Sequence, residues 1–185
     1  MACNVTITGR ALPCKDSLGG IKEIWIAPFA LAGVPQTFDA VSAGLIPDST
    51  AAMTFKNYDM HKNTGSFTQT VNASVENGTI FYTQVVSCVF SREIAADISN
   101  FQDLTKGRVF IIVQDVNNNL FLMGHTRGCE LTGGTLESGT AMGDFNGLKY
   151  EFTGEEFIAA PFVTSALGIP TGTKLAAGWT PTIPS

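Results

Sequence analysis

Hydrophobic and polar residues alternate with a period of two over much of the chain, which is typical of β-strands with one face in water. Strands are predicted at 21–28 (IKEIWIAP) and within 51–60 (AAMTFKNYDM). Two further runs, GSFTQTVNASV and TIFYTQVVSCVFS, flank Glu76-Asn77-Gly78. Because Asn-Gly is among the strongest short hairpin signals, these two runs predict an antiparallel hairpin.

The second half of the chain repeats this pattern. RVFIIVQDV and LFLMGHTRG surround the turn NNN, which predicts a second hairpin. Its apolar run from Val109 to Val113 is typical of a strand that is buried on both faces. LKYEFTGEEF is the last clear strand, and the glycine-rich stretch at 132–147 before it is interpreted as a connector of turns with room for a short strand.

One segment, 91–107, changes from a period of two to a helical period. Ser91 is a candidate N-cap, Gly107 ends the pattern, and the apolar positions are Ile94, Ile98, Phe101 and Leu104. The prediction is a mainly β fold: an antiparallel β-sandwich or small barrel, with one flanking amphipathic α-helix at about 91–106 and extended N- and C-terminal arms. At 185 residues the chain is expected to form a single domain, 1–185.

Three segments do not have the pattern of ordinary loops. Residues 1–20 form an N-terminal arm, and 28–50 is a long apolar loop punctuated by prolines. Residues 158–185 contain four prolines and one charged residue, Lys174. A disordered tail would be polar, so this segment is expected to be an extended arm that lies on a surface, its own or a neighbour's.

The composition narrows the range of functions that the chain could have. Only 15% of the residues are charged, which suggests that other copies of the chain cover part of the surface. The formal charge of −5 and the lack of a basic cluster argue against nucleic-acid binding. The apolar runs are too short to span a membrane, and MACNVTITGR lacks the features of a signal peptide, which predicts a cytosolic site of synthesis.

The cysteines and histidines do not have metal-ligand spacing. Cys3, Cys14, Cys88 and Cys129 form no CxxC pair, and the two histidines form no paired ligand motif with them. Cys88 is interpreted as a small buried apolar residue. No metal and no cofactor are expected.

Catalytic motifs are also missing, so the chain is not expected to be an enzyme. Gly19-Gly20 precedes a strand and not a helix, which indicates a structural joint and not a phosphate loop. In a strand Glu151 and Glu155 share one face while Glu156 takes the other, so these acids are interpreted as surface or interface residues. Asp144 is interpreted as a turn residue and His125 as a structural residue near a strand end.

The order of these elements carries a family resemblance. CKDSLGGIKEIWI leads into the first strand, a long polar hairpin precedes one amphipathic helix and a second hairpin, and SGTAMGDFNGLKYEFTGEE supplies a turn and a last strand. This series resembles the tail tube proteins of long-tailed bacteriophages, and more distantly the tube protein of contractile secretion systems. The resemblance covers about 14–157. It implies a structural virion protein that assembles with itself and with other tail proteins into stacked six-fold rings, a hollow conduit for the genome.

One face of the first long hairpin strand suits such a conduit. Its members are small, polar and uncharged, and they are the candidates for facing the lumen: Thr68, Thr70, Asn72 and Ser74. Lysines at these positions would bind DNA through counterion release, whereas neutral groups would let it slide without sequence-specific binding. The resemblance implies location in the virion tail after assembly in the host cytoplasm, with no membrane.

The arms supply the candidates for subunit interfaces: Phe162, Leu167, Ile169, Trp179, Phe29 and Leu31. The alternative for the C-terminal arm is that it folds back on its own subunit. The alternative for the whole chain is a β-sandwich binding module, lectin-like or adhesin-like, on a virion or cell surface, with Trp179 or Tyr58 as an exposed aromatic residue.

Overall fold

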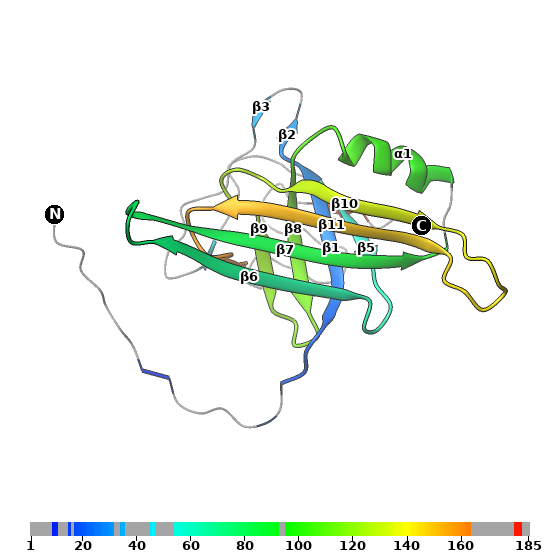
Figure 1. Cartoon of the computed structure of the whole chain (residues 1–185), viewed down its shortest axis with the longest axis horizontal. Helices are drawn as coiled ribbons and strands as arrows, with labels where there is room; N and C mark the ends of the chain where they lie inside the picture. Colours follow the sequence, from blue (N-terminus) through cyan, green and yellow to red (C-terminus); the bar gives the residue numbers. More distant parts are fainter. Residues whose placement is uncertain are drawn as a thin grey trace.

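The computed structural model describes residues 9–10, 15, 17–31, 34–35, 45–46, 54–92, 95–163 and 180–182. These residues form two packed β-sheets and a single short helix, so the prediction of a mainly β sandwich with one helix is confirmed (Figure 1). The elements are β1 Ile21–Pro28, β2 Ala30–Leu31, β3 Val34–Pro35, β4 Leu45–Ile46, β5 Thr54–Asp59, β6 Gly65–Ser74, β7 Thr79–Ser91, α1 Ala95–Leu104, β8 Val109–Asp115, β9 Leu120–Met123, β10 Glu130–Glu137, β11 Gly147–Glu156, β12 Phe162–Val163 and β13 Thr180–Thr182.

The larger sheet has the strand order β13-β5-β1-β8-β9-β12-β4, and the smaller one has the order β10-β11-β7-β6. The smaller sheet is antiparallel throughout, and in the larger sheet only β4 and β13 pair in parallel. The strands of the smaller sheet cross β1, β8 and β9 in front of them (Figure 1). Ile24 and Ile111 of the larger sheet pack with Val86 and Phe152 of the smaller one, which makes the core between the two layers.

Strand β8 is buried on both faces, as its unbroken apolar run predicts. Ile111 belongs to the core between the sheets, whereas Phe110 and Ile112 belong to a second cluster on the opposite face of the larger sheet. This second cluster, the far-face cluster, consists of Trp25, Ala27, Phe29, Phe55, Phe110, Ile112, Leu120, Leu122 and Val163. The larger sheet therefore has buried apolar side chains on both of its faces.

The helix starts later than its sequence pattern predicts. Ser91 is not an N-cap, because it ends β7 and pairs with Gly147 of β11. The chain turns at Arg92, whose φ is 64° and whose N–H donates to the Asn146 carbonyl (2.9 Å), and α1 begins at Ala95. Ser91 is therefore used for strand pairing with β11 and not as the N-cap of α1. The Phe101 ring of α1 stacks on Tyr150 at a centroid distance of 5.4 Å, which fixes the helix on the core.

The glycine-rich stretch begins with a full strand, longer than the short strand that the sequence interpretation allows for within a connector of turns. Strand β10 has eight residues and pairs with β11 across a register shift between Leu131 and Gly133. Gly134 lies beneath the helix, because a Cβ at this position would come within 2.5 Å of the Phe101 ring. This glycine therefore permits the close approach of a helix to a strand and does not mark a turn.

The predicted arms and the long loop lie only partly within the described residues. Gly20 has a φ of 115° and its carbonyl accepts from the Val116 N–H (3.2 Å), so the double glycine is a joint that opens β1. The loop at 28–50 contains the β2–β3 hairpin and β4. Two pieces of the C-terminal arm, β12 and β13, join the larger sheet of their own subunit. These two pieces agree with the alternative that the arm folds back.

Candidate functional site: the open face of the four-stranded sheet

The smaller sheet has one face on the core and one face turned away from it. On β6 and β7 the core face carries Phe67, Val86 and Cys88, so alternation sends the intervening residues to the other side. We call that side the open face. Strand register assigns to it Ser66, Thr68, Thr70, Asn72 and Ser74 of β6, Thr79, Phe81, Thr83, Val85, Ser87, Val89 and Ser91 of β7, Lys149, Glu151, Thr153 and Glu155 of β11, and Glu130, Thr132, Thr135 and Glu137 of β10.

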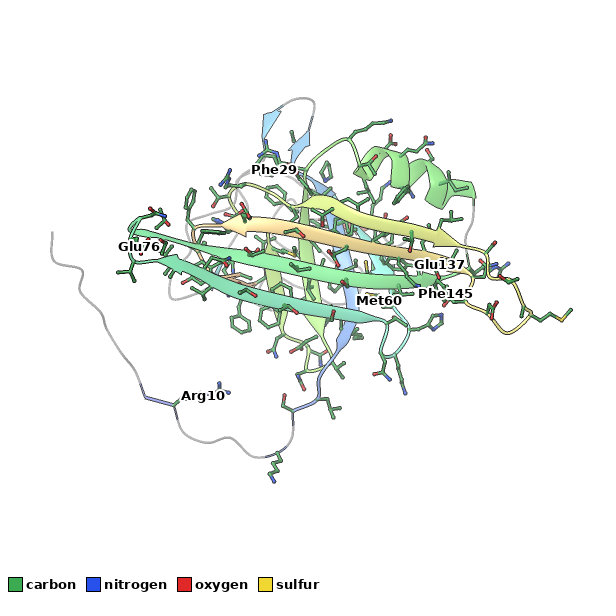
Figure 2. The ribbon with its side chains drawn as sticks, in the orientation of Figure 1. Arg10, Phe29, Met60, Glu76, Glu137 and Phe145 are labelled. Carbon is green, nitrogen blue, oxygen red and sulfur yellow. The ribbon has the colours of Figure 1, made fainter. Side chains whose placement is uncertain are left out.

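All four residues predicted to face a lumen lie together on this open face. Thr68 and Thr70 are exposed, and Asn72 and Ser74 are half-buried. On β7 hydroxyl side chains share the open face with Phe81, Val85 and Val89, and the Asn72 amide donates to the Thr83 hydroxyl (2.7 Å). Figure 2 shows the side chains that project from this sheet toward the viewer. The face is polar through neutral groups that bond across strands.

The only lysine on the open face is neutralised by a neighbour. Lys149 Nζ donates to both carboxylate oxygens of Glu137, at 2.7 and 2.8 Å. This hydrogen bond lowers the pKa of the Glu137 carboxyl from its usual value. Four glutamates and one lysine give the face a formal charge of −3. The face therefore offers no positive charge to a polyanion.

The adjacent acids Glu155 and Glu156 point to opposite sides, as predicted, but only one is a surface acid. Glu155 is exposed on the open face. Glu156 is 1% exposed, and its Oε1 accepts from the N–H groups of Thr126 (2.9 Å) and Arg127 (2.7 Å). Its interpretation as a surface or interface residue is wrong, because it fixes the turn after β9. Periodicity predicts the side of the strand to which a residue points but not how deeply that residue is buried.

The remaining candidates from the sequence have structural positions. Asp144 Oδ2 accepts from the N–H groups of Ala141 (2.7 Å) and Thr140 (2.8 Å), which lower its pKa in a tight turn. His125 lies in the turn after β9, within 3.1 Å of the Thr126 hydroxyl. Tyr58 is half-buried, with its ring 5.7 Å from that of Phe90.

The two described cysteines are buried free thiols. Burial raises the pKa of Cys88 to about 12, and it raises the pKa of Cys129 as well, with help from the negative charge of Glu156. Because the thiolate is the reactive form, neither side chain is an effective nucleophile near neutral pH. Cys88 is thus the small buried residue that the sequence predicts. Cys3 and Cys14 lie outside the described residues.

The interface candidates are divided by the structure. Phe29 is 7% exposed in the far-face cluster, 5.0 Å from the Phe110 ring, so it belongs to the core of its own subunit. Phe162 is 43% exposed and its ring is 4.7 Å from that of Phe121. The side chain of Leu31 and the whole of Leu167, Ile169 and Trp179 lie outside the described residues.

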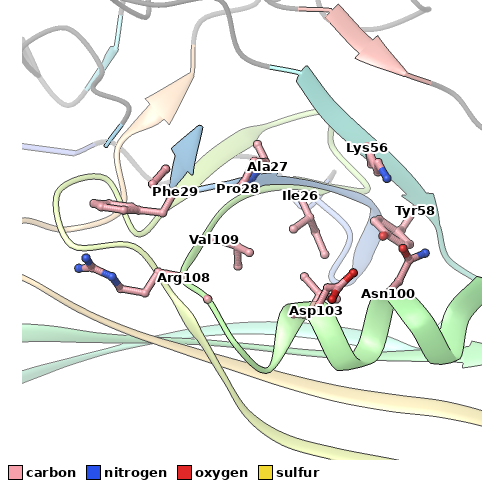
Figure 3. Close-up of a pocket in the computed structure, with 13 residues that line it drawn as sticks. Ile26, Ala27, Pro28, Phe29, Lys56, Tyr58, Asn100, Asp103, Arg108 and Val109 are labelled. Carbon is pink, nitrogen blue, oxygen red and sulfur yellow. The ribbon is translucent and has the colours of Figure 1, made fainter. Parts of the chain in front are cut away.

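Sequence reasoning missed a cavity of about 560 Å³ that lies beneath α1 (Figure 3). Its lining comes from β1, the start of β2, β5, α1 and the start of β8 with the segment before it: Ile26, Ala27, Pro28, Phe29, Ala30, Lys56, Tyr58, Asn100, Asp103, Leu104, Gly107, Arg108 and Val109. No single stretch of the chain contains the residues that meet there, so the sequence carries no local signal for it.

Within the described ranges, no group of three or more His, Cys, Asp or Glu side chains has an arrangement suited to a metal ion. No helix among these residues has the length and apolar character needed to cross a membrane. Comparisons with protein-family models, with curated proteins and with solved structures return no match to the chain.

Proposed function

We propose that the chain is a structural virion protein, the tail tube protein of a long-tailed bacteriophage. In this proposal the subunits form homo-hexameric rings that stack into a hollow tail tube, assembled in the host cytoplasm, through which the genome passes during DNA ejection. Other tail proteins are its remaining partners, and duplex DNA passes without sequence-specific binding.

The open face of the four-stranded sheet carries the proposal. A sheet face exposed on a monomer normally mixes lysine and glutamate, whereas this one consists mainly of hydroxyl and amide side chains, and its single lysine is paired with Glu137. A wall of this kind would not retain DNA, because retention requires cations that displace the counterions of phosphate. Its acids would repel the duplex weakly and at short range.

The edges of the same sheet support lateral closure. Strands β6 and β10 form its two edges, since among the described strands β6 pairs with β7 alone and β10 with β11 alone. Six four-stranded sheets joined edge to edge, with strands about 4.8 Å apart and tilted, close to a backbone diameter of roughly 40–50 Å. Duplex DNA fits within such a ring after the side chains are subtracted. Open edges of this length otherwise promote aggregation, so a partner strand is expected.

Electron microscopy of the purified protein tests the proposal directly. We expect hollow tubes, or six-fold rings, to appear as the protein concentration rises. A monomer that persists at high concentration, or a solid filament without a lumen, would contradict the tail tube function.

A lysine substitution then tests the role of the open face. Thr68→Lys/Thr70→Lys should still form tubes, because both side chains are exposed. These tubes should retain duplex DNA at about 50 mM salt and release it at high salt, since the interaction is screened. The matched control is Ser99→Lys/Gln102→Lys on the exposed side of α1, which should retain much less DNA. Equal retention by both variants would show that the open face does not line the lumen.

A further inference from the structure

The β6–β7 hairpin extends beyond the sheet to which it belongs. Strand β11 pairs with β7 only as far as Tyr82, whereas β6 and β7 continue to pair up to Ser74 and Thr79. Residues 72–81 therefore form a two-stranded ribbon at one end of the molecule, with Glu76 at its tip (Figures 1 and 2). A ribbon of two strands is barely stable without a surface to pack on.

The side of this ribbon opposite the open face is apolar and exposed. Ile80 is 57% exposed, Val75 in the turn is 98% exposed, and Val71, which directly precedes the ribbon, is 54% exposed. Glu76 is the only charged residue between Val71 and Phe81. An exposed apolar strip on a projecting element is typical of a docking surface, whereas scattered exposed apolar residues are not. We call residues 71–80 the hairpin tip.

The cavity beneath α1 has complementary properties. Ile26, Phe29 and Val109 supply its apolar surface (Figure 3). Lys56 lies at its border and is exposed, and no ion pair to it occurs in the part of the chain that the structure describes. Arg108 is held in place, because it donates to the Arg127 carbonyl (2.8 Å) and lies over the Phe29 ring. The one acid of the lining, Asp103, is paired with Lys106.

We infer that the hairpin tip of one copy of this chain inserts into the cavity beneath α1 of a second copy, with Val75 and Ile80 on the apolar surface and Glu76 beside Lys56. The two surfaces match in polarity and in charge. The hairpin tip and the lining of the cavity share no residue, so the contact joins two different surfaces, head to tail, and repeats from copy to copy. The inference rests on the proposed function, to which it adds the contact that joins successive subunits.

Two single variants and their mixture test the contact. Val75→Asp places a charge on the apolar hairpin tip and leaves the cavity intact. Lys56→Glu reverses the positive charge at the border of the cavity and leaves the hairpin tip intact. Each variant alone should sediment as a smaller species than the wild type under assembly conditions. Mixed in equal amounts, they should form a species of twice the mass of either variant alone, whether subunit or ring, and stop there, because only the intact tip of one and the intact cavity of the other can join. A mixture that sediments like the separate variants would overturn the inference.

Charge reversal provides the rescue. Glu76→Lys alone should raise the concentration needed for assembly at least tenfold, and Glu76→Lys combined with Lys56→Glu should return it to within about threefold of the wild type, since opposite charges meet again. Met142→Asp is the matched control, because Met142 is an equally exposed apolar residue in another turn and should assemble normally. Circular dichroism checks that each variant is folded.

The outcomes separate this inference from the proposed function. Hollow tubes that form equally well with Val75→Asp would overturn the contact and leave the tail tube function standing. Solid filaments that depend on Val75 and Lys56 would support the contact and contradict the tail tube function. A wild-type protein that is monomeric at every concentration would overturn both.

Discussion

The two outward-directed faces of the sandwich differ completely in chemistry. On β6, Thr68 and Thr70 point to the open face and are exposed. On β8, Phe110 and Ile112 point away from the core between the sheets, yet both are 0% exposed, because they belong to the far-face cluster. The larger sheet thus buries apolar side chains on both of its faces, whereas the smaller sheet buries them on one face and is mainly polar on the other.

The hydrophobic pattern of the strands predicts this difference between the two faces. A strand with one wet face alternates, as β6 does, whereas a strand with two dry faces contains an unbroken apolar run, as β8 does from Val109 to Val113. The same contrast separates the effects of substitution. Substitutions in the far-face cluster should lower the free energy of unfolding and leave the surface charge unchanged. Substitutions on the open face should alter the surface and leave the free energy of unfolding nearly unchanged.

The largest expected effect is on the far face. Phe110→Ala removes a fully buried ring that packs against Phe29, and should lower the free energy of unfolding by about 3–5 kcal/mol. Thr70→Ala on the open face should change it by less than about 0.5 kcal/mol. Urea denaturation of dilute, unassembled protein measures both. A Thr70→Ala variant as unstable as Phe110→Ala would mean that the Thr70 side chain is buried and not exposed on the open face.

Glu155 and Glu156 provide a matched pair of neighbours on opposite sides of β11. Glu156→Ala leaves the N–H groups of Thr126 and Arg127 without their acceptor, at a cost of about 1–3 kcal/mol for each group that water does not reach. Glu155→Ala removes an exposed carboxylate and should change the free energy of unfolding very little. The midpoints of urea unfolding give the comparison. Equal midpoints for the two variants would contradict the buried role of Glu156.

Much of this contrast is predictable from the sequence. Alternation predicts β1 and β11 and the side on which Thr68 and Thr70 lie, because the period of a strand is fixed by its backbone. Depth is not predictable in this way, since Glu156 is buried by a turn that is distant in the sequence. The start of α1 and the full length of β10 were missed because pairing with β11 outweighed a local cap signal and a local glycine signal.

Gly133 and Gly134 provide a second pair of neighbours with opposite expectations. Gly134→Ala would place a methyl group 2.5 Å from the Phe101 ring and push α1 outward, at a cost of about 1–3 kcal/mol. Gly133→Ala points to the open face, where the nearest atom is Glu151 Cβ at 3.4 Å, and should be tolerated. Thermal unfolding distinguishes them. If the two variants melt at the same temperature, the packing of α1 on β10 is looser than described.

The smallest expected effect concerns the one lysine of the open face. Lys149 holds the pKa of Glu137 below its usual value, so Lys149→Gln should raise that pKa toward the ordinary range. A carboxyl with a lowered folded pKa stabilises the fold above its unfolded pKa, and this contribution is lost as the pH falls through the folded pKa. Both side chains are substantially exposed, so the loss on acidification should be slight and should shrink further in salt. NMR titration of the Glu137 carboxyl in both proteins measures the shift. Asp144 is the internal control, because its pKa is lowered by the N–H groups of Ala141 and Thr140 and should stay low in Lys149→Gln. If Glu137 titrates identically with and without Lys149, the pair is not formed in solution, and the open face then carries an unpaired cation against the polyanion that the proposed function requires it to release.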